Sequence, residues 1–133
     1  MDAETRELVR HRADDRCEYC RIPQAAAPFI TFHVEHVVAR QHLADDSPEN
    51  LALACDRCNA FKGPNLSSID PESGAVVELF HPRRGNWDDH FRLTGGIISG
   101  LTPTGRATVR LLNMNAGRRI ELRELWIEEN GRL

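Results

Sequence analysis

The chain has 133 residues, of which 41% are apolar and 28% are charged, as expected for one soluble globular domain. This composition excludes a disordered or collagen-like chain, and no run approaches the ~18 consecutive apolar residues that a membrane helix needs. The net charge of −3, from 17 basic and 20 acidic residues, argues against a protein that coats nucleic acid through bulk charge. Because the N-terminus has neither a basic start nor an apolar run, we expect no secretory signal and a cytoplasmic location.

The first half of the chain is predicted to contain a helix, a strand, a loop, a strand and a helix, over residues 3–13, 29–34, 41–50, 51–54 and 56–62. Asp2 is a suitable N-cap for the first helix. Gly63 and Pro64 are typical of a helix end, so they stop the second helix.

The second half is predicted to contain a turn, a strand, a turn, two short strands and two helices, over residues 70–74, 75–80, 81–86, 90–93, 96–99, 103–114 and 118–130. Thr102 and Pro103 suit the N-cap and the first position of the earlier helix. In the later helix Leu122, Leu125 and Trp126 fall on one side. No linker separates the two halves, so we predict a single α+β domain over residues 1–133.

All four cysteines lie in two C-x-x-C pairs, Cys17 with Cys20 and Cys55 with Cys58. A reducing cytoplasm disfavours disulfides, whereas two such pairs suit a tetrahedral zinc ion bound by four thiolates. Four thiolates leave no open coordination position, so we expect this Zn²⁺ to be structural. A redox role for the pairs would need a βαβ context, which the predicted elements do not supply.

Three further motifs accompany the cysteine pairs: Glu35-His36, Asn50-Leu51 and Asn59-Ala60-Phe61-Lys62. This pattern resembles the HNH nucleases, in which an acidic residue and a histidine are followed by Asn-Leu and then by C-x-x-C-N-x-x-K. The resemblance covers about residues 17–63 and implies a ββα-metal (His-Me finger) core stapled by the zinc. The core would follow the N-terminal helix at 3–13. A C-terminal extension over 70–133, with a β-hairpin and two helices, is similar to the tail of a bacterial subgroup of these proteins.

Phosphodiester hydrolysis needs a base that activates water and a cation that neutralises the developing charge. An ordinary histidine is largely neutral near pH 7 and can act as such a base, a capacity that His36 has. Glu35 and Asn59 offer the carboxylate and amide oxygens that a hard cation such as Mg²⁺ prefers. The resemblance implies the same roles: His36 as general base of a DNA endonuclease, and Glu35 and Asn59 as ligands of catalytic Mg²⁺ or Mn²⁺.

The remaining motif residues are expected to support this chemistry. Asn50 would fasten the loop and orient His36 through hydrogen bonds. Lys62 shares a helix face with Asn59 and is predicted to contact a DNA phosphate. Arg40 is a second candidate for DNA contact, with a solvated surface role equally favoured. Neighbours on a strand point to opposite faces, so Glu35 and His36 can share one site only if the strand ends or bulges there, and we expect that it does.

Two other functional classes are considered. A zinc nucleobase deaminase would use His33, Glu35 and the second cysteine pair, but Ala54 stands where its signature has proline. A non-catalytic zinc module that binds nucleic acid or protein explains the cysteines but not the Glu35-His36 motif.

Two features depart from the family pattern, and the last helix has two alternative interpretations. Glu35 stands where aspartate is frequent, and the Gly-Gly common after the histidine motif is absent. Three arginines of the last helix are candidates for a DNA-facing patch: Arg118, Arg119 and Arg123. A solvated face is favoured, because Glu121 and Glu124 interleave with them.

Overall fold

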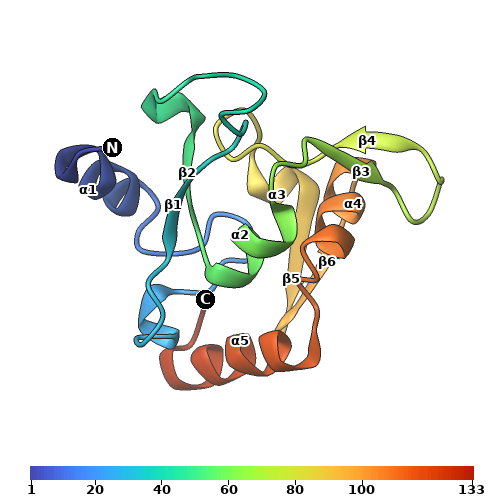
Figure 1. The fold of residues 1–133 in the computed structure, drawn as a ribbon. Coiled ribbons are helices and arrows are strands. Elements are labelled where there is room, and N and C mark those ends of the chain that lie inside the picture. The colour runs from blue at the N-terminus through green and yellow to red at the C-terminus, as the bar shows by residue number, and fades with distance from the viewer.

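The computed structural model describes residues 1–133, which form five α-helices and three two-stranded antiparallel sheets (Figure 1). The elements in chain order are α1 Ala3–Arg12, β1 His33–His36, β2 Leu51–Ala54, α2 Asp56–Lys62, β3 Ser67–Ile69, β4 Val76–Glu78, α3 Trp87–His90, β5 Phe91–Thr94, β6 Ile97–Gly100, α4 Pro103–Leu111 and α5 Gly117–Asn130. None of the helices combines the length and apolarity needed to cross a membrane. The protein is thus a small mixed α+β molecule.

Strands β1 and β2 pair antiparallel, with Glu35 opposite Ala52 and His36 opposite Leu51. All four residues of β2 are buried, and α2, which follows β2 directly, packs against both strands. The predicted bounds of β2 and α2 agree with the structure. Helix α2 ends where Gly63 takes a positive φ of 50°, a conformation that favours glycine.

The first strand lies later in the chain than predicted, at 33–36 rather than 29–34. The Gln24 side chain occupies the backbone groups that a longer strand would pair. Its amide donates to Ala27 O and Ile30 O and its oxygen accepts from Phe32 N. Phe29 is 99% exposed, so the apolar run at 29–34 forms a surface loop instead of a buried strand.

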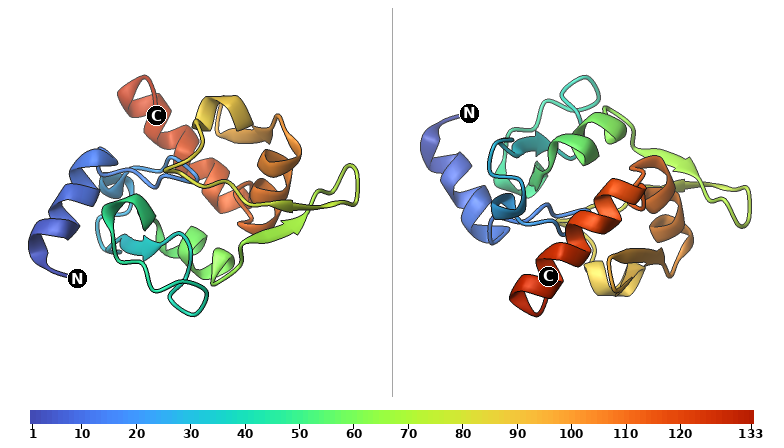
Figure 2. Two further views of the ribbon diagram at one scale, coloured as in Figure 1. Left: turned by 90° about the horizontal axis from the view of Figure 1, so that it is seen from above. Right: turned by 90° about the horizontal axis from the view of Figure 1, so that it is seen from below.

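The extension contains two hairpins, β3 with β4 and β5 with β6, and the helices α4 and α5. Strand β3 and the short helix α3 were not predicted, and α4 ends at Leu111 instead of residue 114. Helix α4 begins as expected, with the Thr102 hydroxyl accepting from Gly105 N at 3.0 Å. In the view from above, the extension lies alongside the earlier elements and the β3–β4 hairpin projects from the molecule (Figure 2).

Both halves of the chain contribute to one hydrophobic core. The core contains all four cysteines together with residues of the extension such as Phe80, Trp87 and Met114. The Trp87 indole donates to Tyr19 O at 2.8 Å, within the first C-x-x-C pair. Arg83 forms an ion pair with Glu18, which lies between Cys17 and Cys20. The extension is therefore packed directly onto the cysteine segment.

Helix α5 buries only part of the apolar stripe that its sequence predicts, because Leu122 packs against the core and Leu125 does not. Leu125 is 55% exposed, whereas Arg123 is fully buried. The predicted solvated face is therefore wrong at Arg123, which the helix turns into the protein. Arg118 is exposed, as expected for a solvated position.

Candidate active site and metal centre

The four cysteines meet in one buried cluster, in which all Sγ atoms lie within 4.8 Å of one another. The Sγ atoms of Cys20 and Cys55 are 3.7 Å apart. Zinc–sulfur bonds of about 2.3 Å in a tetrahedron require roughly this separation. The cysteines are thus positioned to bind a metal ion, and their geometry fits zinc. A zinc deaminase would leave Cys17 and Cys20 outside such a site.

Each C-x-x-C pair has an internal hydrogen bond that prepares it for a metal. The backbone N–H of Cys20 donates to Cys17 Sγ, and that of Cys58 donates to Cys55 Sγ, both at 3.4 Å. Cys55 is also the N-cap of α2. These donors fix the direction of the first sulfur in each pair.

Glu35 is only 8% exposed and lies on the inner side of β1. Its Oε1 atom is buried and has no hydrogen-bond partner. Burial raises the pKa of Glu35, while the nearby Lys62 ammonium and the Tyr19 hydroxyl oppose that increase. An unsatisfied buried carboxylate oxygen is costly, so this atom fits the role of a ligand to a hard cation.

His36 is the last residue of β1 and pairs in regular register with Leu51, and the next residue, Val37, continues the pairing by donating from its N–H to Asn50 O at 2.8 Å. Its Nε2 atom is 2.7 Å from Asp46 Oδ1, and the side chain is 16% exposed. A carboxylate can only accept, so Nε2 carries the proton and the neutral ring keeps its lone pair on Nδ1. In this tautomer the free lone pair of His36 is on Nδ1, the ring atom that can accept a proton.

Asn50 is buried and fastens the loop after β1. Its oxygen accepts from Val38 N, and its amide donates to Val38 O and Asp45 O, all within 3.0 Å. It makes no hydrogen bond to His36. Asn50 instead holds the backbone next to Asp46, so any effect on His36 passes through that carboxylate.

Asn59 lies in the middle of α2, is half-buried, and makes no side-chain hydrogen bond within the protein. Its amide oxygen is therefore available to a ligand. Lys62, one turn later, is 2% exposed and donates from Nζ to Val37 O at 2.7 Å. This burial does not fit the predicted phosphate contact, because the ammonium faces the end of β1 beside Glu35 and not the surface.

Comparison with known families identifies the segment that holds these residues. Residues 17–64 match the family model for HNH endonuclease. The matched segment, residues 17–64 of the 133, is similar to an HNH endonuclease domain, and the name HNH domain refers to this segment. The matched segment includes both cysteine pairs and all of the motif residues predicted from the sequence, which confirms the resemblance. No curated protein and no solved structure matches the chain.

Within the HNH domain, Arg40 is engaged with the residue that holds His36. Its Nε and Nη2 atoms both lie 3.2 Å from Asp46 Oδ1. The Arg40 side chain is nevertheless 63% exposed. The guanidinium therefore supports Asp46 while it keeps an open side toward solvent.

Sequence reasoning missed the residues that act from outside the motif. Asp46 was assigned only to a polar loop, and its distance from His36 along the chain gives no periodic signal. Arg119 was assigned to a solvated or DNA-facing helix surface, yet its Nη2 donates to Cys58 Sγ at 2.9 Å. Both contacts are made in three dimensions between elements that no local pattern connects.

Proposed function

We propose that the HNH domain hydrolyses phosphodiester bonds of DNA, with His36 as general base and Glu35 and Asn59 as ligands of one Mg²⁺ or Mn²⁺ ion. The observation that supports this most is the pairing of His36 Nε2 with Asp46, which leaves Nδ1 to accept a proton. The buried, donor-free Oε1 atom of Glu35 adds an anionic ligand next to that imidazole. The four cysteines hold a structural zinc ion.

In the proposed reaction, Nδ1 of His36 takes a proton from water as the water oxygen attacks phosphorus. The bond from phosphorus to the 3′ oxygen breaks in line, and the departing 3′ oxygen takes a proton from solvent water, giving a 5′-phosphate and a 3′-hydroxyl. Asp46 stabilises the imidazolium that forms, because it accepts from Nε2 throughout. Glu35 and Asn59 would hold the divalent cation, which would supply charge neutralisation for the reaction.

Lys62 is assigned a positioning role in place of the DNA contact. Its ammonium donates to Val37 O and lies near the Glu35 carboxylate, whose charge partly offsets the cost of burying the lysine. Burial lowers the pKa of Lys62, and the Glu35 carboxylate opposes that decrease. We propose that Lys62 holds the end of β1 and thereby fixes the position of the Glu35 carboxylate relative to His36. Arg40 remains the proposed DNA-contacting residue, through its exposed side.

A plasmid-nicking assay with Mg²⁺, Mn²⁺ or EDTA tests the proposed function. We expect cleavage with either cation and none with EDTA. His36→Ala should lower the rate by about 10²- to 10⁴-fold, because general-base catalysis contributes that much, while folding and DNA binding persist. His42→Ala is the matched control: this histidine bonds Pro64 O and has no proposed role in the reaction. DNA binding without cleavage by the wild-type protein would instead favour a non-catalytic zinc module.

A further inference from the structure

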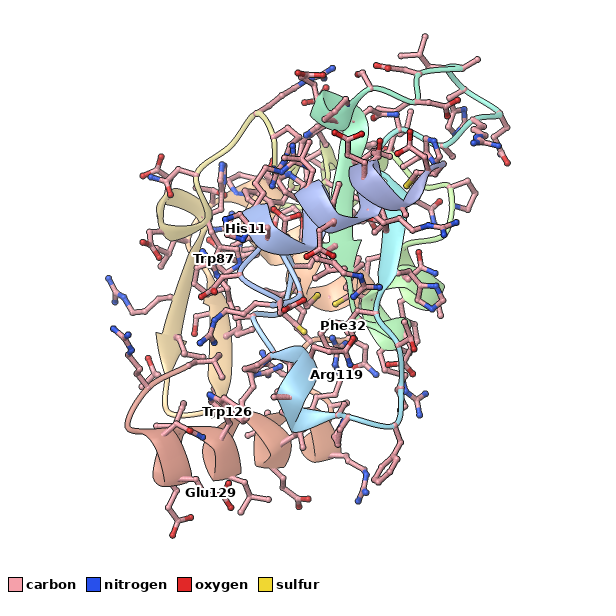
Figure 3. All side chains as sticks on the ribbon, turned by 90° about the vertical axis from the view of Figure 1, so that its left-hand side faces the viewer. His11, Phe32, Trp87, Arg119, Trp126 and Glu129 are labelled. Atoms are coloured by element: carbon pink, nitrogen blue, oxygen red, sulfur yellow. The ribbon has the colours of Figure 1, made fainter.

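Two arginines of α5 lie beside the cysteine cluster. Arg119 donates from Nη2 to Cys58 Sγ at 2.9 Å and to Cys55 Sγ at 3.7 Å, and from Nη1 to Leu112 O at 2.5 Å. Arg123 is fully buried and donates to Gly96 O at 2.7 Å and to Met114 O at 2.6 Å. In Figure 3 the yellow sulfur atoms gather at the centre of the molecule, between the labelled Trp87 and Arg119.

Neither guanidinium has a carboxylate partner, since the ion pairs of the protein involve other arginines. Arginine stays charged under all ordinary conditions, and a buried charge without a counter-charge is strongly unfavourable. Backbone carbonyls satisfy the N–H groups of Arg123 but do not neutralise it. The Sγ atoms of Cys58 and Cys55 contact the Arg119 guanidinium directly. Arg123 lines the same cavity as Cys20, Cys55 and Arg119, so the sulfur cluster is the group that can supply negative charge to both arginines.

The charges of the two groups match. Four thiolates around one divalent ion carry two negative charges in excess, and the two guanidiniums supply two positive ones. We propose that Arg119 and Arg123 neutralise the metal–tetrathiolate centre, so that metal binding in the HNH domain and docking of α5 are coupled. This proposal is independent of whether the domain cleaves DNA.

A cavity of about 340 Å³ lies between the cluster and α5, and Cys20, Cys55, Arg119 and Leu122 are among its lining residues. Helix α5 thus covers the side of the cysteine cluster that faces this cavity. Coupling between two binding events is reciprocal, so a docked α5 strengthens zinc binding by the same factor by which zinc strengthens docking. The C-terminal extension acquires a role from this: it completes the metal centre.

The coupling is tested by the zinc affinity of single variants, and this affinity is measured by competition with a chromophoric chelator. Arg119→Gln should bind Zn²⁺ about 10- to 100-fold more weakly than the wild type, as residues that support metal ligands typically do. Arg118→Gln is the matched control, because Arg118 is the exposed neighbour on the same helix, and it should retain wild-type affinity. Arg119→Lys should lie between the two, since it keeps the charge but loses the planar donor pair. Equal zinc affinity in Arg119→Gln and the wild type would overturn the proposal.

Hydrogen exchange in α5 is a second readout, and its measurement on the wild-type protein does not depend on the folding of any variant. Backbone amides of Gly117–Asn130 should exchange faster after zinc is stripped from the wild-type protein. They should also exchange faster in zinc-loaded Arg119→Gln than in zinc-loaded Arg118→Gln. Unchanged α5 protection on zinc removal shows that the helix docks without the metal and contradicts the coupling.

Discussion

The orientation of His36 depends on a single carboxylate in the loop before β2. Asp46 is 70% exposed at its side chain, yet it accepts from His36 at 2.7 Å and from Arg40 at 3.2 Å. The Arg40 guanidinium and the His36 contact hold the pKa of Asp46 below its ordinary value, with the His36 hydrogen bond as the larger cause. The carboxylate is thus charged across the pH range in which a histidine can act as a base.

We predict that Asp46→Asn slows DNA cleavage by about 10- to 100-fold, a part of the contribution of general-base catalysis. The amide can still accept from Nε2, but it carries no charge to stabilise the imidazolium. Initial rates of plasmid nicking measure the effect. Asp45→Asn serves as the control, because its side-chain oxygen still accepts from Ser47 N. A rate for Asp46→Asn equal to that of this control would remove Asp46 from the mechanism.

At the scale of elements, α4 approaches the β5–β6 hairpin so closely that a side chain has no room at Gly105. A Cβ atom there would lie 2.1 Å from His90 O and 3.3 Å from Gly100 Cα. Both neighbours are backbone atoms, so neither can rotate away. The packing of α4 on the hairpin therefore depends on the missing side chain.

Gly105→Ala is expected to lower the free energy of unfolding by about 1–3 kcal/mol, the usual cost of forcing extra atoms into a packed region. Gly117→Ala is the matched helix substitution, because a Cβ at Gly117 meets nothing within 4 Å. It should be neutral or stabilising by up to about 1 kcal/mol, since alanine has the better helix propensity. Urea denaturation of both variants measures the difference, and equal midpoints would disprove the close packing.

Asp70 joins the β3–β4 hairpin to α4. Its two oxygens accept from Arg106 Nε at 2.9 Å and Nη2 at 3.0 Å, and from the Ser73 hydroxyl at 2.7 Å. The Arg106 guanidinium is the main reason that the pKa of Asp70 lies well below its ordinary range. A lowered pKa in the folded state means that the contact stabilises the protein above the unfolded pKa of about 4 and loses its effect as pH falls further.

The melting temperature of Asp70→Asn should therefore be lower than that of the wild type at neutral pH. This difference should shrink as the pH is lowered from about 5 toward 2, because acid protonates the wild-type carboxylate as well. Thermal unfolding monitored by circular dichroism over that range measures it. Glu72→Gln, which removes the exposed partner of Arg106, should have a small effect at every pH. A difference for Asp70→Asn that stays constant with pH would contradict this account.

The whole molecule is organised around the cysteine cluster. Trp87 and Arg83 of the extension bind the Cys17–Cys20 segment, and Arg119 of α5 binds the second pair. Glu18 links this arrangement to β2, because it also accepts from Leu53 N at 2.8 Å. Segments from most of the chain therefore meet at one centre, so a metal bound there would act on the stability of the entire protein.

Removal of zinc by a strong chelator should lower the melting temperature by more than about 10 °C, because a structural zinc ion contributes directly to folding. Cys17→Ser should melt lower than the wild type when zinc is present, and the two should melt together in excess chelator. Metal analysis before and after chelation establishes the occupancy. A wild-type protein that melts at the same temperature with and without chelator would show that the cysteine cluster needs no metal.

Several parts of this protein follow from the sequence by itself. The C-x-x-C spacing predicts the metal cluster, and the run Asp56–Lys62 followed by Gly63 and Pro64 gives the bounds of α2. The motif residues are recognisable because each motif places its functional side chains within a few residues of one another along the chain. Local propensity and periodicity decide such features, so they are visible without coordinates.

The tertiary structure decided which charged residues are inside. Lys62 and Arg123 are charged residues of the kind that usually lies at the surface, and no local pattern distinguishes them from Arg118. Both are nevertheless buried. Their burial depends on acceptors that lie far along the chain: Val37 is 25 residues from Lys62, and Gly96 is 27 residues from Arg123. A charge is stable in the interior only where the fold brings it a counter-charge or hydrogen-bond acceptors, and that arrangement exists only once the chain has folded.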